Sequence, residues 1–369
     1  MSWSLASVVA DTGGAEALVP VLEAVAEKGA LGGIVAAAPA AVVLARAGLP
    51  FTNADAVATN DEGAWLASVG ATAVLTSTSW GGSPIELRFI AAARERQLPT
   101  AAMVDFWSNY RARFTDATGE LVLPDWIVVP DDVAAAEAAS DGLPADRLVP
   151  AGNPHYERLL ERSATFGADQ RLAFRESVGV PRKATLVLFA SQPIRELYGE
   201  SLGYTESGVL LDVREALQQA MEWLGHRAVL AVRSHPGERN PIVVSATSGV
   251  AVRSGNEGDP LSWVLAADLV VGMTSALLVQ AALVGSRVVS VQPGLVGGDR
   301  LPTNRLGLTD SVYQRAEIAP ALYRALARPA HLGSGRALQR LRGAATGATA
   351  RVTSLAVELA SGVAMGPPR

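Results

Sequence analysis

The sequence predicts an α/β protein with two domains, each built on a parallel β-sheet. Short runs rich in Val, Ala and Leu alternate with longer stretches of helical periodicity, which is typical of β-α-β units. This alternation stops near the middle of the chain and then starts again. A length of 369 residues is also that of two domains of ordinary size.

The first half predicts one Rossmann-like domain over residues 1–155. Its expected strands cover residues 5–10, 33–37, 69–76, 100–105 and 126–129. Its expected helices cover residues 15–28, 40–47 and 84–96. The last of these opens on Pro84, whose missing N–H is no loss at a helix start.

The second half predicts a similar domain over residues 181–335, after a linker helix over residues 156–180. Residues 336–369 are expected to form C-terminal helices. The expected strands of the second domain cover residues 185–190, 228–232, 250–253, 269–271 and 287–291, and its expected helices cover 211–224, 260–267 and 275–283.

Composition excludes several classes of protein. The chain has no cysteine, which rules out disulfides, thiolate nucleophiles and cysteine-bound metals. A net charge of −5 disfavours nucleic acid as a partner, and the four histidines lack metal-binding spacing. No apolar stretch is long enough for a transmembrane segment, and no basic region precedes the first apolar run. We therefore expect a cytoplasmic protein without a bound metal.

Two strand ends of the second half carry residues that suit a nucleotide. The strand over 228–232 runs into Arg233-Ser234-His235-Pro236-Gly237-Glu238. Loops at the carboxyl ends of parallel strands face the ligand crevice, and Pro236 restricts His235 to an extended conformation. We interpret Arg233, His235 and Pro236 as nucleotide or phosphate ligands; a solvated surface loop is the alternative.

The second such strand end is Gly272-Met273-Thr274-Ser275, which leads into a helix. The N–H groups of the first helical turn, with the helix dipole behind them, form an anion site that suits a diphosphate. Caps of this kind also occur without any ligand. Combined with the preceding loop, the motif predicts donor contacts from Gly272, Thr274 and Ser275.

These segments resemble nucleotide-sugar glycosyltransferases of the GT-B fold, in which two Rossmann-like domains flank a cleft. The resemblance rests on the Arg-Ser-His-Pro loop, the Gly-x-Thr-Ser helix start with the Leu-Val-Gly-Ser-Arg-Val-Val that follows, and residues 151–156, Ala-Gly-Asn-Pro-His-Tyr. The His-Pro pair is similar to that of bacterial capsule, sialic-acid and teichoic-acid transferases with cytidine-nucleotide donors. Gln280 stands nearest to the position where many such enzymes carry a glutamate for ribose or sugar hydroxyls.

The resemblance implies further donor contacts. In GT-B proteins the loop after the first strand of the second domain faces the donor phosphates. Here that loop supplies Ser191, Gln192 and Arg195. An ordinary polar loop that starts a helix is the alternative.

The resemblance places the acceptor in the first domain. Residues 104–113 form the densest polar and aromatic cluster of the chain, and Asp105 begins it at a strand end. An acceptor hydroxyl that attacks an anomeric carbon needs a carboxylate or an imidazole as base, so Asp105 is the first candidate. Trp107, Asn109 and Tyr110 are expected to contact the acceptor; a loop-capping Asp105 with core aromatics is the alternative.

Three other segments are expected on the acceptor side. Gly13 and Gly14 follow the first strand, but their loop is not Gly-x-Gly-x-x-Gly and does not predict a dinucleotide site. Glu16 and His155 are the next candidates for the base. Trp80, in Ser-Trp-Gly-Gly-Ser, is a weaker candidate for acceptor contact.

We therefore predict an enzyme that moves a sugar from a nucleotide-sugar donor to a hydroxyl or amine of a small molecule or glycan, in carbohydrate or natural-product biosynthesis. No cofactor is expected, since the nucleotide sugar is a substrate and helix N-termini with Arg195 and Arg233 would stabilise the leaving group. A homodimer is left open.

Two alternatives remain at this stage. Non-hydrolysing sugar-nucleotide 2-epimerases carry Gly-Thr-Arg-Pro-Glu after their first strand and Arg-Arg-Glu-Asn at the start of the second domain. The equivalents here, Thr12-Gly13-Gly14-Ala15-Glu16 and Pro193-Ile194-Arg195-Glu196, lack most of those arginines. The second alternative is a non-catalytic protein that binds nucleotide sugars.

Overall fold

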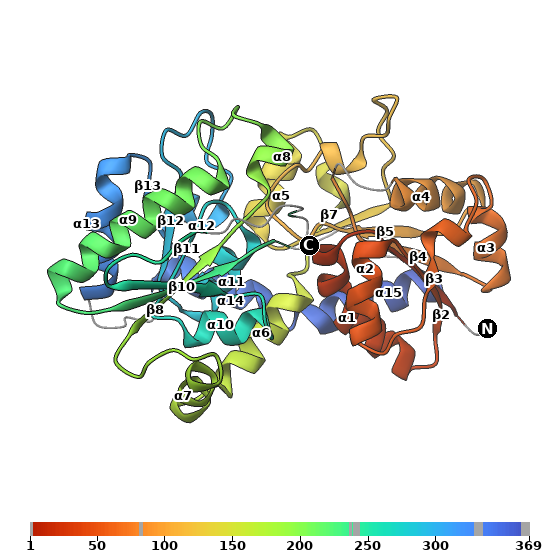
Figure 1. Cartoon of the computed structure of the whole chain (residues 1–369). Helices are drawn as coiled ribbons and strands as arrows, with labels where there is room; N and C mark the ends of the chain where they lie inside the picture. Colours follow the sequence, from red (N-terminus) through yellow and green to blue (C-terminus); the bar gives the residue numbers. More distant parts are fainter. Residues whose placement is uncertain (1–2, 81–83, 236–237, 239–243, 328–334, 363–369) are drawn as a thin grey trace. The chain divides into compact units, whose positions relative to one another are not determined.

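The computed structural model describes residues 3–80, 84–235, 238, 244–327 and 335–362. The chain divides into two compact units. Unit 1 consists of Met1–Arg158 and Leu341–Arg369, and unit 2 of Leu159–Arg340. Each unit contains one parallel sheet, shown by the strand arrows in Figure 1. The predicted class of two parallel α/β domains is confirmed.

Unit 1 has a seven-stranded sheet in the order β3-β2-β1-β4-β5-β6-β7. Its strands are β1 (Leu5–Val9), β2 (Leu31–Ala36), β3 (Thr52–Asn53), β4 (Ala73–Thr76), β5 (Thr100–Met103), β6 (Trp126–Val129) and β7 (Leu148–Pro150). Its α-helices are α1 (Thr12–Glu27), α2 (Ala38–Arg46), α3 (Glu62–Ser68), α4 (Ile85–Glu95), α5 (Asp132–Ser140), the first part of α6 (Pro154–Ala164), most of α14 (Arg336–Ala345) and α15 (Ala348–Ser361).

Alternation along β1 explains how both faces of this sheet are covered. Leu5 and Val9 pack with α1, α2 and α15 in one core cluster, whereas Ala6 and Val8 pack with α3 and α4 in another. Successive side chains of a strand point to opposite faces, so a strand buried on both sides is mostly apolar; Ser7, the polar residue of β1, donates from its hydroxyl to the carbonyl of Leu75. The last described helix, α15, thus completes the layer that the first helix begins.

Unit 2 has a six-stranded sheet in the order β10-β9-β8-β11-β12-β13. Its strands are β8 (Thr185–Ala190), β9 (Ala228–Arg233), β10 (Val250–Ser254), β11 (Leu269–Gly272), β12 (Val288–Val291) and β13 (Asp310–Val312). Its α-helices are the rest of α6, then α7 (Ala168–Ser177), α8 (Ile194–Tyr198), α9 (Glu206–Leu224), α10 (Pro260–Ala266), α11 (Ala276–Val284), α12 (Pro302–Arg305) and α13 (Ile318–Ala327), followed by the start of α14.

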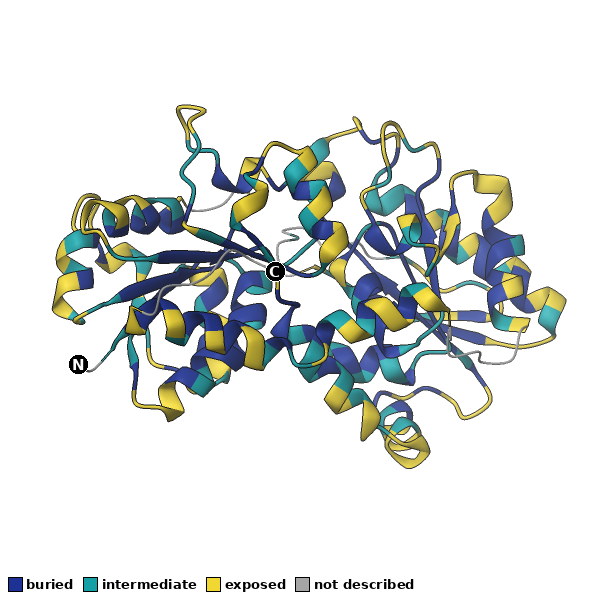
Figure 2. Cartoon of the chain, turned by 180° about the vertical axis from the view of Figure 1, so that it is seen from behind, coloured by how far each residue is buried: buried dark blue, intermediate teal, exposed yellow. Residues whose placement is uncertain are grey.

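The central strands of both sheets are the most deeply buried elements, as the dark blue in Figure 2 shows, whereas the edge strands β3, β10 and β13 are partly exposed. In unit 2, α9 and α13 pack together on the face formed by Val187, Phe189, Leu230 and Val232. Every strand pair in the described part of the chain is parallel. None of the described helices is long and apolar enough to cross a membrane.

Two sequence expectations differ from the structure. The single helix expected over 156–180 is two helices, α6 and α7, because Gly167 caps the start of the second. The strand expected over 69–76 begins only at Ala73, since α3 and its C-cap Val69 occupy the preceding residues. Strands of two or three residues, such as β3 and β13, are too short to show a period of two in the sequence.

The sheet topology fixes where each unit can bind a ligand. In unit 1 the strand order reverses between β1 and β4, and in unit 2 it reverses between β8 and β11. At such a switch point the loops at the carboxyl ends of the two strands lead away to opposite faces and leave a crevice. The residues that follow β1, β4, β8 and β11 are therefore the first to inspect.

Candidate functional site

The switch point of unit 1 is lined by hydroxyl and carboxyl groups. Ser77 follows β4, and its Oγ accepts a hydrogen bond from the backbone N–H of Ala10 at the end of β1 (3.3 Å). The same hydroxyl donates to the carboxylate of Glu86, which also accepts from the backbone N–H and the Oγ of Ser79 (2.8 and 2.7 Å). These bonds tie β1, β4 and α4 together.

Glu86 is a buried carboxylate of the first turn of α4. Burial raises its pKa, and the three donors from Ser77 and Ser79 act in the opposite direction. Its oxygens are occupied by these donors. We therefore assign Glu86 a supporting role, holding the β4 loop in position.

Asp11 lies on the other side of the switch point, between β1 and α1. Its Oδ1 accepts a hydrogen bond from the backbone N–H of Gly14 (2.6 Å), so it is the N-cap of α1. Burial, followed by the negative charges of Asp105 and Glu86, raises the pKa of Asp11 from 3.8 to about 7, against the opposing effects of the hydrogen bond from Gly14 and the charge of Arg113. A carboxyl group with a pKa close to the working pH is suited to general acid–base chemistry.

Asp105, the predicted base, is held in an ion pair. Its Oδ1 accepts from Nη1 of Arg113 (2.8 Å), and that guanidinium also donates to the carbonyl and the Oγ1 of Thr78 (2.8 and 3.1 Å). The side chain of Arg113 is 7% exposed. Leaving such a buried cation without its carboxylate would be costly, so the pair serves the structure of the site first.

The glycines of the α1 loop are required by close packing. A Cβ on Gly13 would overlap Oδ2 of Asp105, and a Cβ on Gly14 would overlap the side chain of Ser77. The absence of side chains at these two positions lets Asp105 and Ser77 approach α1. We call Asp11, Ser77, Glu86, Asp105 and Arg113 the unit 1 cluster.

The two other predicted bases lie together beside this cluster. Nε2 of His155, on α6, is 3.5 Å from Oε2 of Glu16, on α1. Asn153 connects this pair to Asp105, because its Nδ2 donates to the carbonyl of Asp105 (3.0 Å) and its Oδ1 accepts from the backbone N–H of His155 (2.9 Å). The structure thus brings all three sequence-predicted bases to one end of the unit 1 sheet.

Trp107 and Tyr110 differ from the expectation that they contact an acceptor. Trp107 is 1% exposed, stacks on Tyr156 and donates from Nε1 to Asp131 (2.9 Å). Tyr110 is 5% exposed and donates from its hydroxyl to Glu137 (2.7 Å). Their rings are covered by the protein itself, so both belong to the core.

Trp80 and Asn109, in contrast, line one cavity of about 720 Å³ together with Arg111, Thr115 and Asp141. The indole of Trp80 is 41% exposed, and Asn109 adopts a left-handed conformation with φ of 57°. An exposed aromatic ring beside polar groups suits the apolar and polar faces of a sugar. Both residues are therefore positioned where an acceptor could contact them, and their role as acceptor contacts stays a prediction.

At the switch point of unit 2, the loops after β8 and β11 are joined directly. Oε1 of Gln192 accepts from the backbone N–H of Thr274 (2.8 Å) and from its hydroxyl (3.2 Å). A Cβ on Gly272 would lie 2.7 Å from the carbonyl oxygen of Ala190, so this glycine lets the two strand ends come close. Ser275 is the N-cap of α11, whose first turn begins at this junction.

A second set of bonds joins the loops after β8 and β9. Ser191 donates from its hydroxyl to Glu238, and the backbone N–H of His235 donates to the other oxygen of the same carboxylate (3.0 Å). Burial raises the pKa of Glu238. His235 itself is exposed, and Arg233 donates to the carbonyl of Gly255 (2.7 Å). We call Ser191, Gln192, Thr274, Ser275 and Glu238 the unit 2 cluster.

The remaining predicted donor residues are less closely tied to this cluster. Arg195 is exposed on α8, and its backbone N–H donates to Glu206 (2.8 Å). Gln280 lies partly exposed on α11, one turn beyond its start. Pro236 lies outside the described residues.

Sequence reasoning missed four residues that complete the two clusters. Asp11 lies in the loop after the first strand, next to Gly13 and Gly14. An aspartate between a strand and a helix is a signal for a helix N-cap, and the sequence therefore pointed to this residue. Glu238 ends the loop after residue 232 and Arg113 ends the polar cluster over residues 104–113, but neither was predicted as a site residue, and Glu86 gave no such signal. Arg113 lies in a 3₁₀ turn eight residues after Asp105, where no helical or strand period connects them.

No protein-family model and no curated protein matches this chain. Solved structures do match it over nearly its whole length. The UDP-GlcNAc 2-epimerase of Neisseria meningitidis, solved with UDP-GlcNAc bound, is 14% identical, with a TM-score of 0.67 over 96% of this chain and 100% of that one. A putative UDP-N-acetylglucosamine 2-epimerase of Listeria monocytogenes is 13% identical, with a TM-score of 0.68 over 100% and 99%.

A glycotransferase of kitacinnamycin is 14% identical to this chain, with a TM-score of 0.61 over 98% of this chain and 100% of that one. These structures have the GT-B fold, and the chain described here shares it. The fold expected from the short motifs of the sequence is therefore confirmed.

Proposed function

We propose that this protein is a nucleotide-sugar-dependent glycosyltransferase that transfers a sugar to a hydroxyl or amine acceptor. The observation that carries the proposal is the contrast between its two switch points. The unit 2 cluster gathers hydroxyl, amide and helix N-terminal groups, which suit a nucleotide diphosphate. The unit 1 cluster gathers carboxylates, which suit removal of a proton from an acceptor.

In this proposal unit 2 binds the donor. The N-terminus of α11, with Thr274 and Ser275, stabilises the negative charge of the leaving diphosphate, and Gln192 holds Thr274 in place. Glu238 accepts hydrogen bonds, so it suits ribose or sugar hydroxyls better than phosphate. Arg195, Arg233 and His235 surround this position as further phosphate or base contacts.

Unit 1 supplies the base, and Asp11 is the residue best placed for it. Asp105 has one oxygen paired with Arg113 and the other packed against Gly13, whereas the pKa of Asp11 lies at about 7. The charge of Asp105 helps to keep the pKa of Asp11 at this level. Glu16 and His155 then position the acceptor or relay the proton.

A 2-epimerase is the second candidate, because five of the similar structures carry that description, one of them as putative. The loop after β1 argues against it. The arginine of the Gly-Thr-Arg-Pro-Glu motif would fall on Gly14, where even a Cβ overlaps Ser77. An epimerase of the familiar kind would therefore need a rebuilt loop at this position.

One experiment separates these functions. The protein is incubated with UDP-GlcNAc and with dTDP, CDP and GDP sugars, in the presence and absence of EDTA, and the nucleotides and sugars are followed by NMR. A transferase releases nucleoside diphosphate or monophosphate, faster with an acceptor present, and EDTA leaves the rate unchanged. An epimerase converts UDP-GlcNAc into its C2 epimer without net release of UDP.

A non-catalytic binding protein would show a third result. It would gain thermal stability from one nucleotide, by mass action, without turning any sugar over. Absence of both stabilisation and turnover with every nucleotide tested would overturn the proposal.

A further inference from the structure

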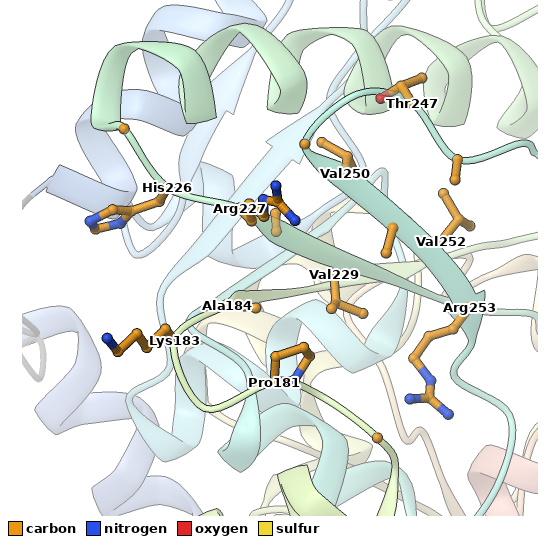
Figure 3. A pocket seen from close by; sticks show the side chains of 16 residues that line it. Pro181, Lys183, Ala184, His226, Arg227, Val229, Thr247, Val250, Val252 and Arg253 are labelled. Carbon is orange, nitrogen blue, oxygen red and sulfur yellow. The ribbon is translucent and has the colours of Figure 1, made fainter.

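Unit 2 has a second cavity at the opposite end of its sheet from the unit 2 cluster. It measures about 1040 Å³ and lies where β9 and β10 begin, beside the segment that leads into β8 (Figure 3). Ligand pockets for small organic molecules commonly have volumes of about 300–1,000 Å³. The cavity runs along β10 from Val250 to Arg253, and no residue of the unit 2 cluster lines it, so it is separate from the site described above.

The sheet forms an apolar floor for this cavity. Val229 of β9 is paired in register with Ala251 of β10, the edge strand of the sheet. Val250, the residue before Ala251 and the first of β10, packs in the core with α9 and α13 and borders the cavity at the start of the strand. In Figure 3, Val229 and Arg253 project from the sheet on the side where Pro181 lies.

The rim of the cavity is cationic. Lys183, His226, Arg227 and Arg253 line it, and no Asp or Glu is among the described lining residues. Within the described part of the chain, none of these four side chains forms a salt bridge. This is notable in a chain whose net charge is −5.

Arg253 has a buried donor that its described neighbours leave unsatisfied. Its Nε is buried and has no hydrogen-bond partner among the described residues, and the same is true of Oγ1 of Thr247, which also lines the cavity. Buried polar groups are nearly always hydrogen-bonded, so the guanidinium of Arg253 is not saturated by its neighbours within the described residues. A Cβ on Gly179 would lie 3.1 Å from Nη1 of Arg253, so this glycine gives the guanidinium its room.

A neighbouring cavity of about 440 Å³ extends the positive field. It shares Lys183 and His226 with the first cavity. Arg171, Arg175, Arg182 and Arg287 also line it, and of these Arg171 and Arg175 are paired with Asp268 and Arg182 with Glu176. Paired arginines serve the structure, whereas Lys183 and Arg253 are left to attract a ligand from solution.

We propose that this cavity binds a small organic anion, with an apolar body on Val229 and Ala251 and a carboxylate, phosphate or sulfonate group held by the guanidinium of Arg253, while Lys183 lies on the other side of the cavity and adds to its positive charge. The apolar body would fill the floor that the sheet leaves open, and the anion would pair with the guanidinium of Arg253 where that side chain lines the cavity. This site does not depend on the function proposed for the protein, because it uses none of the residues of either cluster.

The test uses the full chain and the fluorescent sulfonate 1-anilinonaphthalene-8-sulfonate as probe, with phenyl phosphate and phenylacetate as competitors. Arg253→Gln is expected to weaken binding of the probe about tenfold or more, since it removes a charge-assisted hydrogen bond. Arg324→Gln, the same change on an exposed face of α13, serves as the matched control and should leave binding within about twofold.

A second variant keeps the proposal testable if Arg253→Gln does not fold. Ala251→Glu places a carboxylate on the exposed floor of the cavity. It should weaken binding of the anionic probe but leave binding of the neutral analogue N-phenyl-1-naphthylamine unchanged. Displacement by phenyl phosphate alone or by phenylacetate alone identifies the class of anion. Equal binding by wild type, Arg253→Gln and Ala251→Glu would overturn the proposal, and so would displacement of the probe by the nucleotide that binds unit 2.

Discussion

The two switch points of this molecule have the same topology and opposite chemistry. In both units the strand order reverses beside the first strand of the sheet, and the two loops at the reversal are joined by side-chain hydrogen bonds. In unit 1 the joining groups lead to the carboxylates Asp11, Glu86 and Asp105; in unit 2 they lead to an amide and to the start of α11. The fold thus fixes where a ligand can bind, whereas the side chains on the loops decide which ligand it is.

The comparison also shows how each unit brings two strand ends close. Gly13 and Gly14 permit contact with Asp105 and Ser77 in unit 1, and Gly272 permits contact with Ala190 in unit 2. In each case a side chain on the glycine would push the loops apart. Small residues at a switch point are therefore a structural requirement of the cluster beside them.

The largest expected effect is that of Asp11→Asn. Asn retains the oxygen that caps α1 but cannot accept a proton as a base, so turnover should fall about 10²–10⁴-fold while nucleotide still binds unit 2. Steady-state rates and nucleotide-induced thermal shifts measure the two effects. The matched control is Asp131→Asn, which changes the N-cap of α5 in the same unit.

Near-wild-type turnover by folded Asp11→Asn would remove Asp11 from the mechanism. Asp105→Asn is the next variant to compare. If Asp105 acts only by its charge, the acid limb of the pH–rate profile should move to lower pH, because the pKa of Asp11 falls when that negative charge is removed.

Gly14→Ala tests the close packing of Gly14 against Ser77 in the unit 1 cluster. The added methyl overlaps Ser77, so we expect the free energy of unfolding to fall by about 1–3 kcal/mol, measured by urea denaturation. Gly63→Ala in α3 is the control, because its nearest neighbour would be 3.7 Å away. That variant should be stabilised by about 0.4–1 kcal/mol. Equal stability of the two variants would contradict the packing argument.

Gln192→Ala tests the junction in unit 2. Loss of the amide frees the N–H and the hydroxyl of Thr274, and we expect nucleotide to bind about tenfold more weakly. Isothermal titration with the nucleotide found in the donor screen measures this change. Gln218→Ala, on the exposed side of α9, provides the control, and an equal loss in both variants would show that the junction has no special role.

The smallest expected effect is a pH dependence of stability due to Asp11. The folded chain raises its pKa from 3.8 to about 7, so between these pH values the folded state keeps a proton that the unfolded chain has released. Stability is therefore greatest at the low end of this window and is lost as the pH rises towards 7. Relative to wild type, Asp11→Asn should gain about 1–2 kcal/mol between pH 5 and pH 8.

Urea denaturation of both proteins at the two pH values measures this difference. Glu86 is present in both, so its own raised pKa cancels in the comparison. A constant difference between the two proteins across the window would show that Asp11 titrates alike in the folded and unfolded chains.

The sequence by itself determined the repeated α/β pattern and the strand ends that carry polar loops. Trp126–Val129 and Thr185–Ala190 agree with the predicted strands, because continuous apolar runs bounded by turn residues identify a buried parallel strand. It also located Gly13, Gly14, Thr274 and Ser275 at strand ends, since the signals for caps and turns are local.

Only the tertiary structure decided which of these residues meet. Arg113 forms an ion pair with Asp105, and Glu86 accepts a hydrogen bond from Ser77. Gln192 accepts a hydrogen bond from Thr274, which lies 82 positions away in the sequence. The structure likewise buried Trp107 in the core and left Trp80 beside a cavity, although both read as exposed loop aromatics. Periodicity reports the face of an element that is buried, but the partner of a side chain and the pKa of a carboxyl group depend on neighbours that the order of strands in the sheet brings together.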